Sequence, residues 1–217
     1  EYFPIDISKI LKESTTALLN DYENLHMTGI IDNYESGLKF VKNYDNKKNL
    51  IMFLGSSFGN FDYEPGLQFL DQINSSMKDG DLFLIGLDLV KDVNMLEHAY
   101  DDSQGITAQF NLNVLSRINS ELDSDFNIDK FAHHIAYNES KNRVEIYLRS
   151  LENQLVNITK ARIMLQIKQN ELIHTENSYK YTIPKIKNMF SKTGFRIRDM
   201  WFDEKRHFCL VLLSKNN

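Results

Sequence analysis

Two uninterrupted apolar runs constrain the fold most. Residues 50–54 read Leu-Ile-Met-Phe-Leu and end at a glycine, and residues 81–90 contain a second such run after a Lys-Asp-Gly turn. The segment between them, residues 65–77, repeats apolar side chains at helical spacing. Continuous apolar strands separated by amphipathic helices are typical of a parallel sheet that is covered on both faces. The pattern therefore predicts an α/β, doubly wound fold.

The pattern changes along the chain and divides it into three expected parts. Residues 1–128 form most of the α/β core and end in a helical stretch over 93–122. Residues 129–181 form an inserted β-rich lobe, and residues 182–217 return to the core sheet as a helix and a β-hairpin. Inside the lobe we expect an antiparallel meander, whose strands are 133–137, 143–150, 154–158 and 163–167.

Composition excludes several classes of protein. With 42% hydrophobic residues in 217, the chain can bury a core and is not intrinsically disordered. The net charge of -5 and the lack of a basic stripe argue against a nucleic-acid partner. No apolar stretch approaches the roughly 20 residues of a membrane span, and no secretory leader is visible. The single Cys209 cannot form an internal disulfide, so we expect a cytoplasmic protein.

Polar residues follow three of the predicted strands, where ligands of parallel sheets bind. Asp6 suits a ribose diol, residues 32–34 offer an amide and a ring to an adenine, and residues 55–60 contain two glycines that allow close backbone approach. Taken singly, each signal is weak. A carboxylate after a strand is more often a helix cap, and a glycine pair is more often a tight turn.

Taken together, several motifs resemble one family, the histidine-specific, S-adenosylmethionine-dependent methyltransferases of ergothioneine biosynthesis. They occur in order over almost the whole chain, which makes the match more specific than a nucleotide-binding fingerprint. The motifs are residues 2–8 (YFPIDIS), 53–61 (FLGSSFGNF), 88–92 (DLVKD), 99–102 (AYDD), 105–111 (GITAQFN) and 174–178 (HTENS). The resemblance implies a class I methyltransferase-like, Rossmann-like fold, S-adenosylmethionine as cofactor and L-histidine as substrate.

The resemblance also implies a substrate site. Asn60 would hold the α-amino group of histidine, and Tyr100 would bind its carboxylate. Glu176 and Ser178 would grip the imidazole, which Ile146 would contact through its apolar side chain. A neutral imidazole has one N–H donor and one bare nitrogen, so a carboxylate and a hydroxyl two residues apart on a strand suit it.

For the cofactor, the resemblance assigns Asp6 to the ribose and Asn33 and Tyr34 to the adenine, with Gly55 beside the ligand. Asn33 stands where the family carries an aspartate. Its amide oxygen can still accept a hydrogen bond from the adenine amine, so we expect weaker binding at this position rather than none.

By the same resemblance, the sequence starts at the family's second strand. The first strand and its glycine-rich loop have no counterpart, nor does the helical N-terminal part. That strand would lie between the strands that end at Asp6 and Leu54, and its absence would leave two unpaired sheet edges. We therefore expect a part of a longer enzyme, or a gap that another chain fills.

Two alternatives for the function stay open, and some of the residues have simpler explanations. The protein could methylate a different amino acid or amine, or it could be a non-catalytic module that binds a partner through its exposed sheet edge. Glu176 could be an edge-strand charge, and Tyr100 the solvated end of a helix. A metal site at residues 133–134 and 174 is disfavoured, because adjacent histidines on a strand point to opposite faces.

Overall fold

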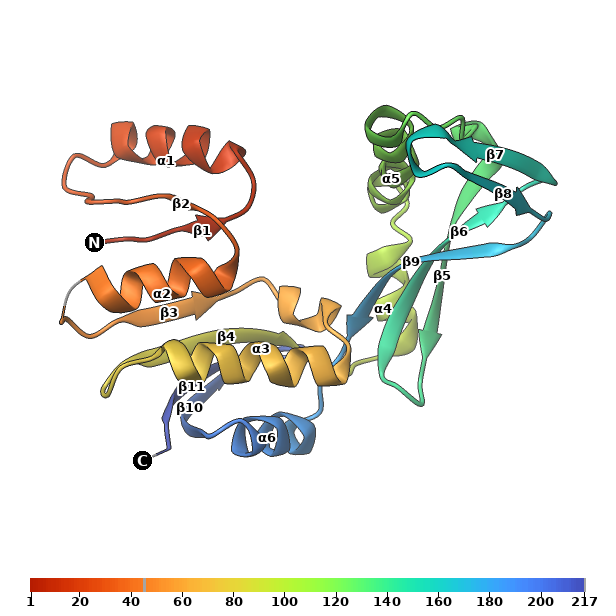
Figure 1. The fold of residues 1–217 in the computed structure, drawn as a ribbon. Helices are drawn as coiled ribbons and strands as arrows, with labels where there is room; N and C mark the ends of the chain where they lie inside the picture. Colours follow the sequence, from red (N-terminus) through yellow and green to blue (C-terminus); the bar gives the residue numbers. More distant parts are fainter. Residues whose placement is uncertain (45, 217) are drawn as a thin grey trace.

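The computed structural model describes residues 1–44 and 46–216 and divides into a core and a lobe (Figure 1). The predicted α/β class is confirmed. The longer helices lie on the core sheets or against the lobe, and they are α1 (Ile10–Asp21), α2 (Tyr34–Tyr44), α3 (Tyr63–Ser76), α4 (Val93–Tyr100), α5 (Ile106–Leu122) and α6 (Ile183–Lys192).

A four-stranded mixed sheet forms the centre of the core. Its order is β10-β11-β4-β3, in which β3 (Leu50–Phe53) runs parallel to β4 (Leu82–Asp88). The hairpin of β10 (Phe195–Phe202) and β11 (Phe208–Lys215) joins it through the antiparallel pairing of β11 with β4. The inward residues of β4 and β11 are fully buried, as are the apolar residues of α3 and α6 that face them. Burial of this apolar area holds the core together.

A second, two-stranded parallel sheet stands beside the first without joining it. It consists of β1 (Ile5–Asp6) and β2 (Ile30–Ile31). Within the described residues, β1 pairs only with β2, and β3 pairs only with β4. A hollow of about 770 Å³, hereafter the strand slot, separates β1 from β3 and is floored by side chains of α2 and α3. The two unpaired sheet edges expected from the sequence are therefore present.

The lobe contains two antiparallel sheets rather than one meander. Three strands follow the order β5 (Phe131–Asn138), β6 (Arg143–Ser150), β9 (Leu172–Tyr179). The other two, β7 (Gln154–Ile158) and β8 (Ile163–Ile167), form a separate hairpin. The predicted strand positions are correct, but the predicted meander order is wrong. The hairpin leaves the sheet because its apolar side chains pack on α5 in a second hydrophobic cluster.

The stretch 93–122 is not one helix. It breaks into α4 and α5 at residues 101–105, where Gly105 adopts the left-handed conformation at φ 67°. The Asp102 carboxylate accepts hydrogen bonds from the backbone N–H groups of Ile106 and Thr107. These bonds satisfy donors that the start of α5 would otherwise leave free, and they hold the pKa of Asp102 at about 2. The break lets α4 pack on the lobe sheet.

Candidate active site

Asn60 and Glu176 meet where the core and the lobe join. Asn60 ends the short 3-10 helix η1 (Ser57–Asn60), which follows β3, and Glu176 lies on β9. The Asn60 side chain comes close enough to the Glu176 carboxyl to lower its pKa. Close approach depends on Gly59, because a Cβ atom there would lie 2.8 Å from the Tyr179 carbonyl oxygen. The loop with Asn60 and the lobe strand therefore face each other, as the family resemblance implies.

Tyr100 and Ser178 form the second pair. The Tyr100 hydroxyl, at the end of α4, lies 2.7 Å from the Ser178 hydroxyl on β9. Tyr100 is held there because α4 packs Leu96 against the buried lobe residues Val144 and Ile146. Ser178 is itself buried. Two hydroxyl groups from distant parts of the chain thus lie side by side in a partly buried place.

Ile146 shares a face of the lobe sheet with the polar residues. In the ladder between β6 and β9, Ile146 pairs with Glu176, and Val144 pairs with Ser178. Side chains of directly paired residues lie on the same face of an antiparallel sheet. The buried Ile146 side chain therefore forms an apolar wall beside the Glu176 carboxylate. All five residues assigned to the substrate are brought together at the junction of core and lobe.

Burial changes the acidity of Glu176. Loss of water around the carboxyl raises its pKa, while the nearby Asn60 amide and the charge of Lys180 oppose that rise. A carboxyl in this position has few water partners to accept hydrogen bonds from. When ionised, this carboxylate can accept a hydrogen bond from an N–H group.

A fully buried lysine adjoins these groups, and sequence analysis missed it. The Lys180 side chain is 1% exposed, and its ammonium lies 2.9 Å from the carboxylate of Asp88, the last residue of β4. The same carboxylate accepts a bond of 2.6 Å from Lys91. A signal was present, because Glu176, Ser178 and Lys180 alternate along an extended segment and so project to one side. Alternation alone gave no reason to bury a charge.

The residues assigned to the cofactor lie on the core side. Asp6 and Tyr34 line the strand slot. One Asp6 oxygen accepts a bond from the Ser8 N–H, and Tyr34 packs edge-on against Phe53. Asn33 does not line the slot, because its amide oxygen accepts a bond from the N–H of Ser36 and so caps α2.

Gly55 connects the two halves of the site. It follows β3 with φ at 78°, and a side chain there would meet no atom within 4 Å. Its neighbour Ser56 accepts a hydrogen bond of 3.0 Å from the Asp88 N–H. The loop that leaves β3 thus passes an open backbone position, then Asp88, and then reaches Asn60.

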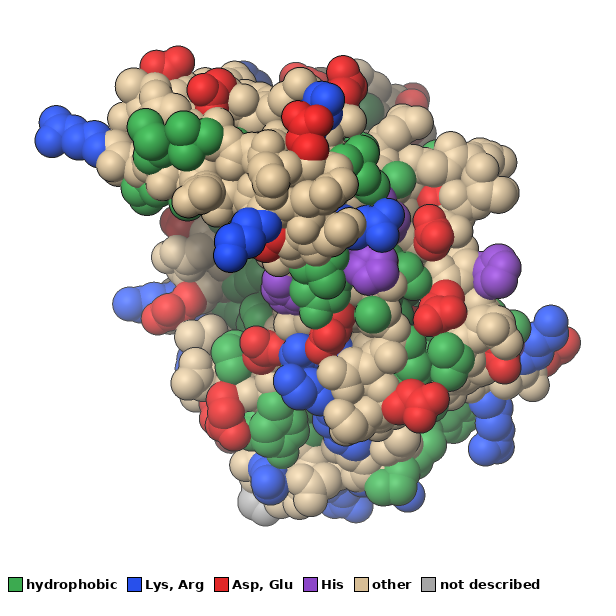
Figure 2. All heavy atoms as spheres, turned by 90° about the vertical axis from the view of Figure 1, so that its right-hand side faces the viewer, with side chains coloured by type: hydrophobic (Ala, Val, Ile, Leu, Met, Phe, Trp, Pro, Cys, Tyr) green, Lys and Arg blue, Asp and Glu red, His purple; other side chains and the backbone are tan. Residues whose placement is uncertain are grey.

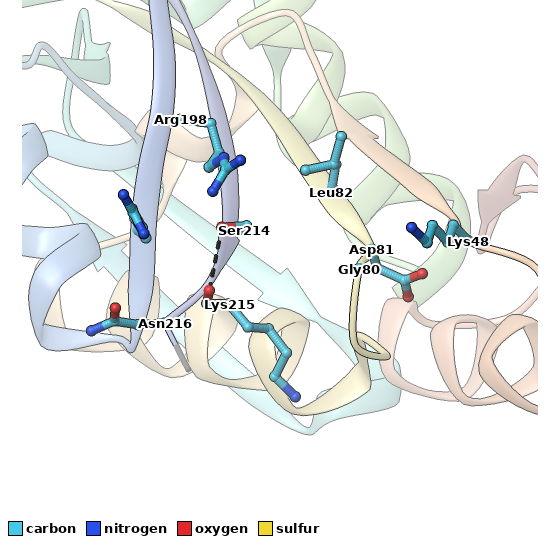
Figure 3. A pocket seen from close by; sticks show the side chains of 9 residues that line it. Lys48, Gly80, Asp81, Leu82, Arg198, Ser214, Lys215 and Asn216 are labelled. Carbon is cyan, nitrogen blue, oxygen red and sulfur yellow. Dashed lines mark hydrogen bonds between the residues drawn. The ribbon is translucent and has the colours of Figure 1, made fainter.

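Other polar features lie outside this site. Within residues 1–44 and 46–216, no group of three or more His, Cys, Asp or Glu side chains could hold a metal ion. A basic hollow of about 370 Å³ lies at another corner of the core sheet, where Lys48, Arg196, Arg198 and Lys215 line it (Figure 3). On the face with the lobe in front, basic side chains are scattered among acidic and neutral ones (Figure 2).

The fold is that of a class I methyltransferase. A methyltransferase from Streptomyces caelestis superposes with a TM-score of 0.51 at 7% identity, covering 99% of this chain and 74% of that one. The sequence matches the family described as "Histidine-specific methyltransferase, SAM-dependent" over residues 1–215. The chain belongs to this family.

Two curated relatives are similar to this chain. "Histidine N-alpha-methyltransferase" of Mycobacterium tuberculosis (strain CDC 1551 / Oshkosh) is 34% identical over 99% of this chain and 66% of its own length. "L-tryptophan methyltransferase" of Psilocybe serbica is 25% identical over 100% of this chain and 64% of its own length. The chain thus spans slightly less than two thirds of either relative. Within the part that the structure describes, no helix has the length and apolar character needed to cross a membrane.

Proposed function

We propose that the protein methylates the α-amino nitrogen of L-histidine with S-adenosylmethionine, towards the trimethylated product. The observation that carries the proposal is the meeting of Glu176 with Asn60, beside the hydroxyl pair of Tyr100 and Ser178. One carboxylate and one hydroxyl pair supply the acceptor and the donor that a neutral imidazole needs. A ligand without the ring N–H would leave a half-buried carboxylate unpaired, which disfavours other amino acids.

The reaction itself demands little acid or base chemistry. When bound, the cofactor supplies a methyl group on a sulfonium sulfur, and transfer forms an N–C bond while the C–S electron pair returns to sulfur. The amine must arrive unprotonated and correctly aimed, so positioning supplies most of the acceleration. Asn60 would orient the amine, and Glu176 with the hydroxyl pair would fix the ring end of the substrate.

The core residues fit the cofactor. Asp6 has one carboxylate oxygen bonded to the Ser8 N–H and a second for a ribose hydroxyl. Gly55 leaves its backbone open, and Tyr34 offers a ring that is 42% exposed. The amide oxygen of Asn33 accepts the hydrogen bond that caps α2. Asn33 would therefore bind the adenine through its amide N–H groups or through the second lone pair of that oxygen.

Kinetics of the full-length gene product test the proposal. Exchange of Glu176→Gln should raise the histidine KM by about 10-fold or more, because a charged acceptor becomes a neutral amide. Glu139→Gln, at an exposed turn of the same lobe, is the matched control. If calorimetry shows that the protein binds tryptophan or another amino acid more tightly than histidine, that amino acid is the substrate instead. An unchanged histidine KM in Glu176→Gln would show that Glu176 does not bind the substrate.

We also propose that the strand slot takes an extended, apolar segment of the full-length polypeptide as a parallel strand between β1 and β3. Unpaired backbone groups border the slot on both sides, and apolar side chains such as Leu38, Phe69 and Ile73 line it. One strand would satisfy both edges at once and bury this lining. The relatives exceed this chain by more than a third of their own length, which leaves ample sequence to supply such a segment.

Hydrogen exchange on the full-length protein tests the slot. Backbone amides of β3 that point away from β4 should exchange about 100-fold or more slowly than amides on the outer edge of β10. That edge is the matched control, because β10 pairs only with β11 in the described residues. Equally fast exchange at both edges would favour the view of this chain as a module whose open edge awaits a separate partner. A cytoplasmic location and the lack of a nucleic-acid partner stay predictions.

A further inference from the structure

Lys180 is the one buried ammonium that touches the proposed imidazole site, among the residues that the structure describes. Its Nζ atom lies 2.8 Å from the Tyr100 hydroxyl, 2.9 Å from the Ser178 hydroxyl and 2.9 Å from Asp88 Oδ2. An ammonium has three N–H donors and no acceptor. All three donors are therefore assigned to partners, and no fourth is left to reach a ligand directly.

We propose that Lys180 is a positioning residue that makes the hydroxyl pair of Tyr100 and Ser178 a hydrogen-bond donor toward the ligand. The inference rests on the proposed function, because it concerns the same imidazole site. Its basis is the number of hydrogen atoms and lone pairs that these three side chains share.

The two hydroxyl groups carry two hydrogens and four lone pairs. One hydrogen lies between the two oxygens, which are 2.7 Å apart and can bond in either direction. Lys180 occupies one lone pair on each oxygen, because it can only donate. The oxygen that accepts from its neighbour then has both lone pairs filled, and all it can offer a ligand is its own hydrogen. The pair thus presents one donor hydrogen, on the oxygen that accepts the internal bond, and keeps one free lone pair on the other oxygen, whichever direction the internal bond takes.

The opposite side of the site presents an acceptor. Glu176 lies two residues before Ser178 on the same face of β9, and the Lys180 charge favours its ionised form. A ligand group that satisfies both sides must donate on one side and accept on the other. The neutral imidazole does this within one small ring, whereas a pyrrole ring has the N–H but lacks the acceptor. Lys180 would therefore set the requirement for the bare ring nitrogen.

Calorimetry on the full-length protein tests this inference with L-histidine and with two pyrrolylalanines, in each of which a C–H replaces one ring nitrogen. The wild type should bind histidine about 10- to 100-fold more tightly, because the free hydroxyl hydrogen finds no acceptor on pyrrole. In Lys180→Met, the two lone pairs that the ammonium occupied become free, so the pair can also accept a hydrogen bond from the pyrrole N–H. The ratio of the two affinities should then fall to about 3-fold or less.

Lys91→Met is the matched control. Lys91 also donates to Asp88, at 2.6 Å, but its bond goes to the opposite carboxylate oxygen, Oδ1, and not to a hydroxyl. Its removal should leave the ratio of affinities at the wild-type value. An unchanged ratio in Lys180→Met, or an equal fall in Lys91→Met, would overturn the inference. If the wild type does not bind histidine, the proposed function itself is wrong.

Loss of a buried charge can unfold a protein, so a second variant keeps the test decisive. Lys180→Gln retains two donor hydrogens but adds an amide oxygen, an acceptor to which the free hydroxyl hydrogen can turn. If circular dichroism shows Lys180→Met to be unfolded, Lys180→Gln should show a ratio about 3-fold below that of the wild type. A wild-type ratio in a folded Lys180→Gln and an equal loss of both ligands each contradict the inference.

Discussion

The His133 ring donates a hydrogen bond of 2.8 Å from Nε2 to the carbonyl oxygen of Tyr100. Its other nitrogen, Nδ1, lies 3.0 Å from the side-chain amide of the buried Asn111, which can only donate there. The amide thereby fixes the tautomer, with the proton on Nε2. His133 thus supports the end of α4, with both ring nitrogens in hydrogen bonds.

Replacement of His133 by Ala should disturb Tyr100. The carbonyl at the end of α4 would lose its partner, and Asn111 would lose an acceptor, at a cost of about 1–3 kcal/mol in the free energy of unfolding. Histidine affinity should fall by about 3- to 10-fold as the Tyr100 hydroxyl moves. Denaturant unfolding and calorimetry measure the two effects. His134→Ala, the neighbour on the opposite face of β5, is the control, and an equal loss there would contradict the supporting role.

Gly59 should not tolerate a side chain. A Cβ atom would lie 2.8 Å from the Tyr179 carbonyl oxygen and 3.4 Å from its nitrogen, so η1 and β9 would have to separate. Overpacking of this kind costs about 1–3 kcal/mol. In Gly59→Ala we expect a lower melting temperature and weaker histidine binding, because Asn60 is drawn away from Glu176. Ser57→Ala, at an exposed position of the same turn, provides the comparison. Wild-type affinity in Gly59→Ala would show that the site does not need this contact.

The strands that the sequence predicts best are those with a clear local pattern of residues. Residues 143–150, 154–158 and 163–167 are strands at the predicted bounds, because each combines β-branched and apolar residues between turn signals. The sequence did not allow the pairing of these strands to be predicted. β9 returns to β6 across the β7–β8 hairpin, and that choice is set by packing on α5 rather than by any local feature.

The site shows the same division. The family resemblance led to Asn60, Tyr100, Glu176 and Ser178, which the structure brings together. Lys180 stayed hidden, because a lysine is almost never fully buried unless it is paired. Its partner Asp88 lies 92 positions away in the sequence, so the pairing becomes visible only when the end of β4 meets the end of β9.

Acid should weaken the lobe through Glu145. Bonds from Tyr147 and Arg143 hold the pKa of this carboxyl at about 2, below its ordinary value of 4.5. A lowered pKa contributes stability above pH 4.5, and the contribution is lost as the pH falls towards 2. In Glu145→Gln, the part of the stability that declines over this interval should be missing. Urea unfolding at about pH 6, 4 and 3 measures this part of the stability. If the free energy of unfolding depends on pH in the same way for both proteins, the assignment is wrong.

Glu176 should show the opposite dependence on pH. Burial raises its pKa above the ordinary value of 4.5, so the folded state holds the proton longer than the unfolded chain does. Below pH 4.5 both states are protonated and no penalty exists. As the pH rises through the folded pKa, the penalty for a half-buried carboxylate appears and stays. Glu176→Gln cannot ionise, so its melting temperature should exceed that of the wild type at pH 8 and approach it at pH 4 (about half a unit below the ordinary pKa). Saturating L-histidine should reduce this difference in melting temperature at pH 8, because the ring N–H then donates a hydrogen bond to the wild-type carboxylate. A difference of the same size at pH 8 and pH 4 would show that burial does not raise the pKa of Glu176.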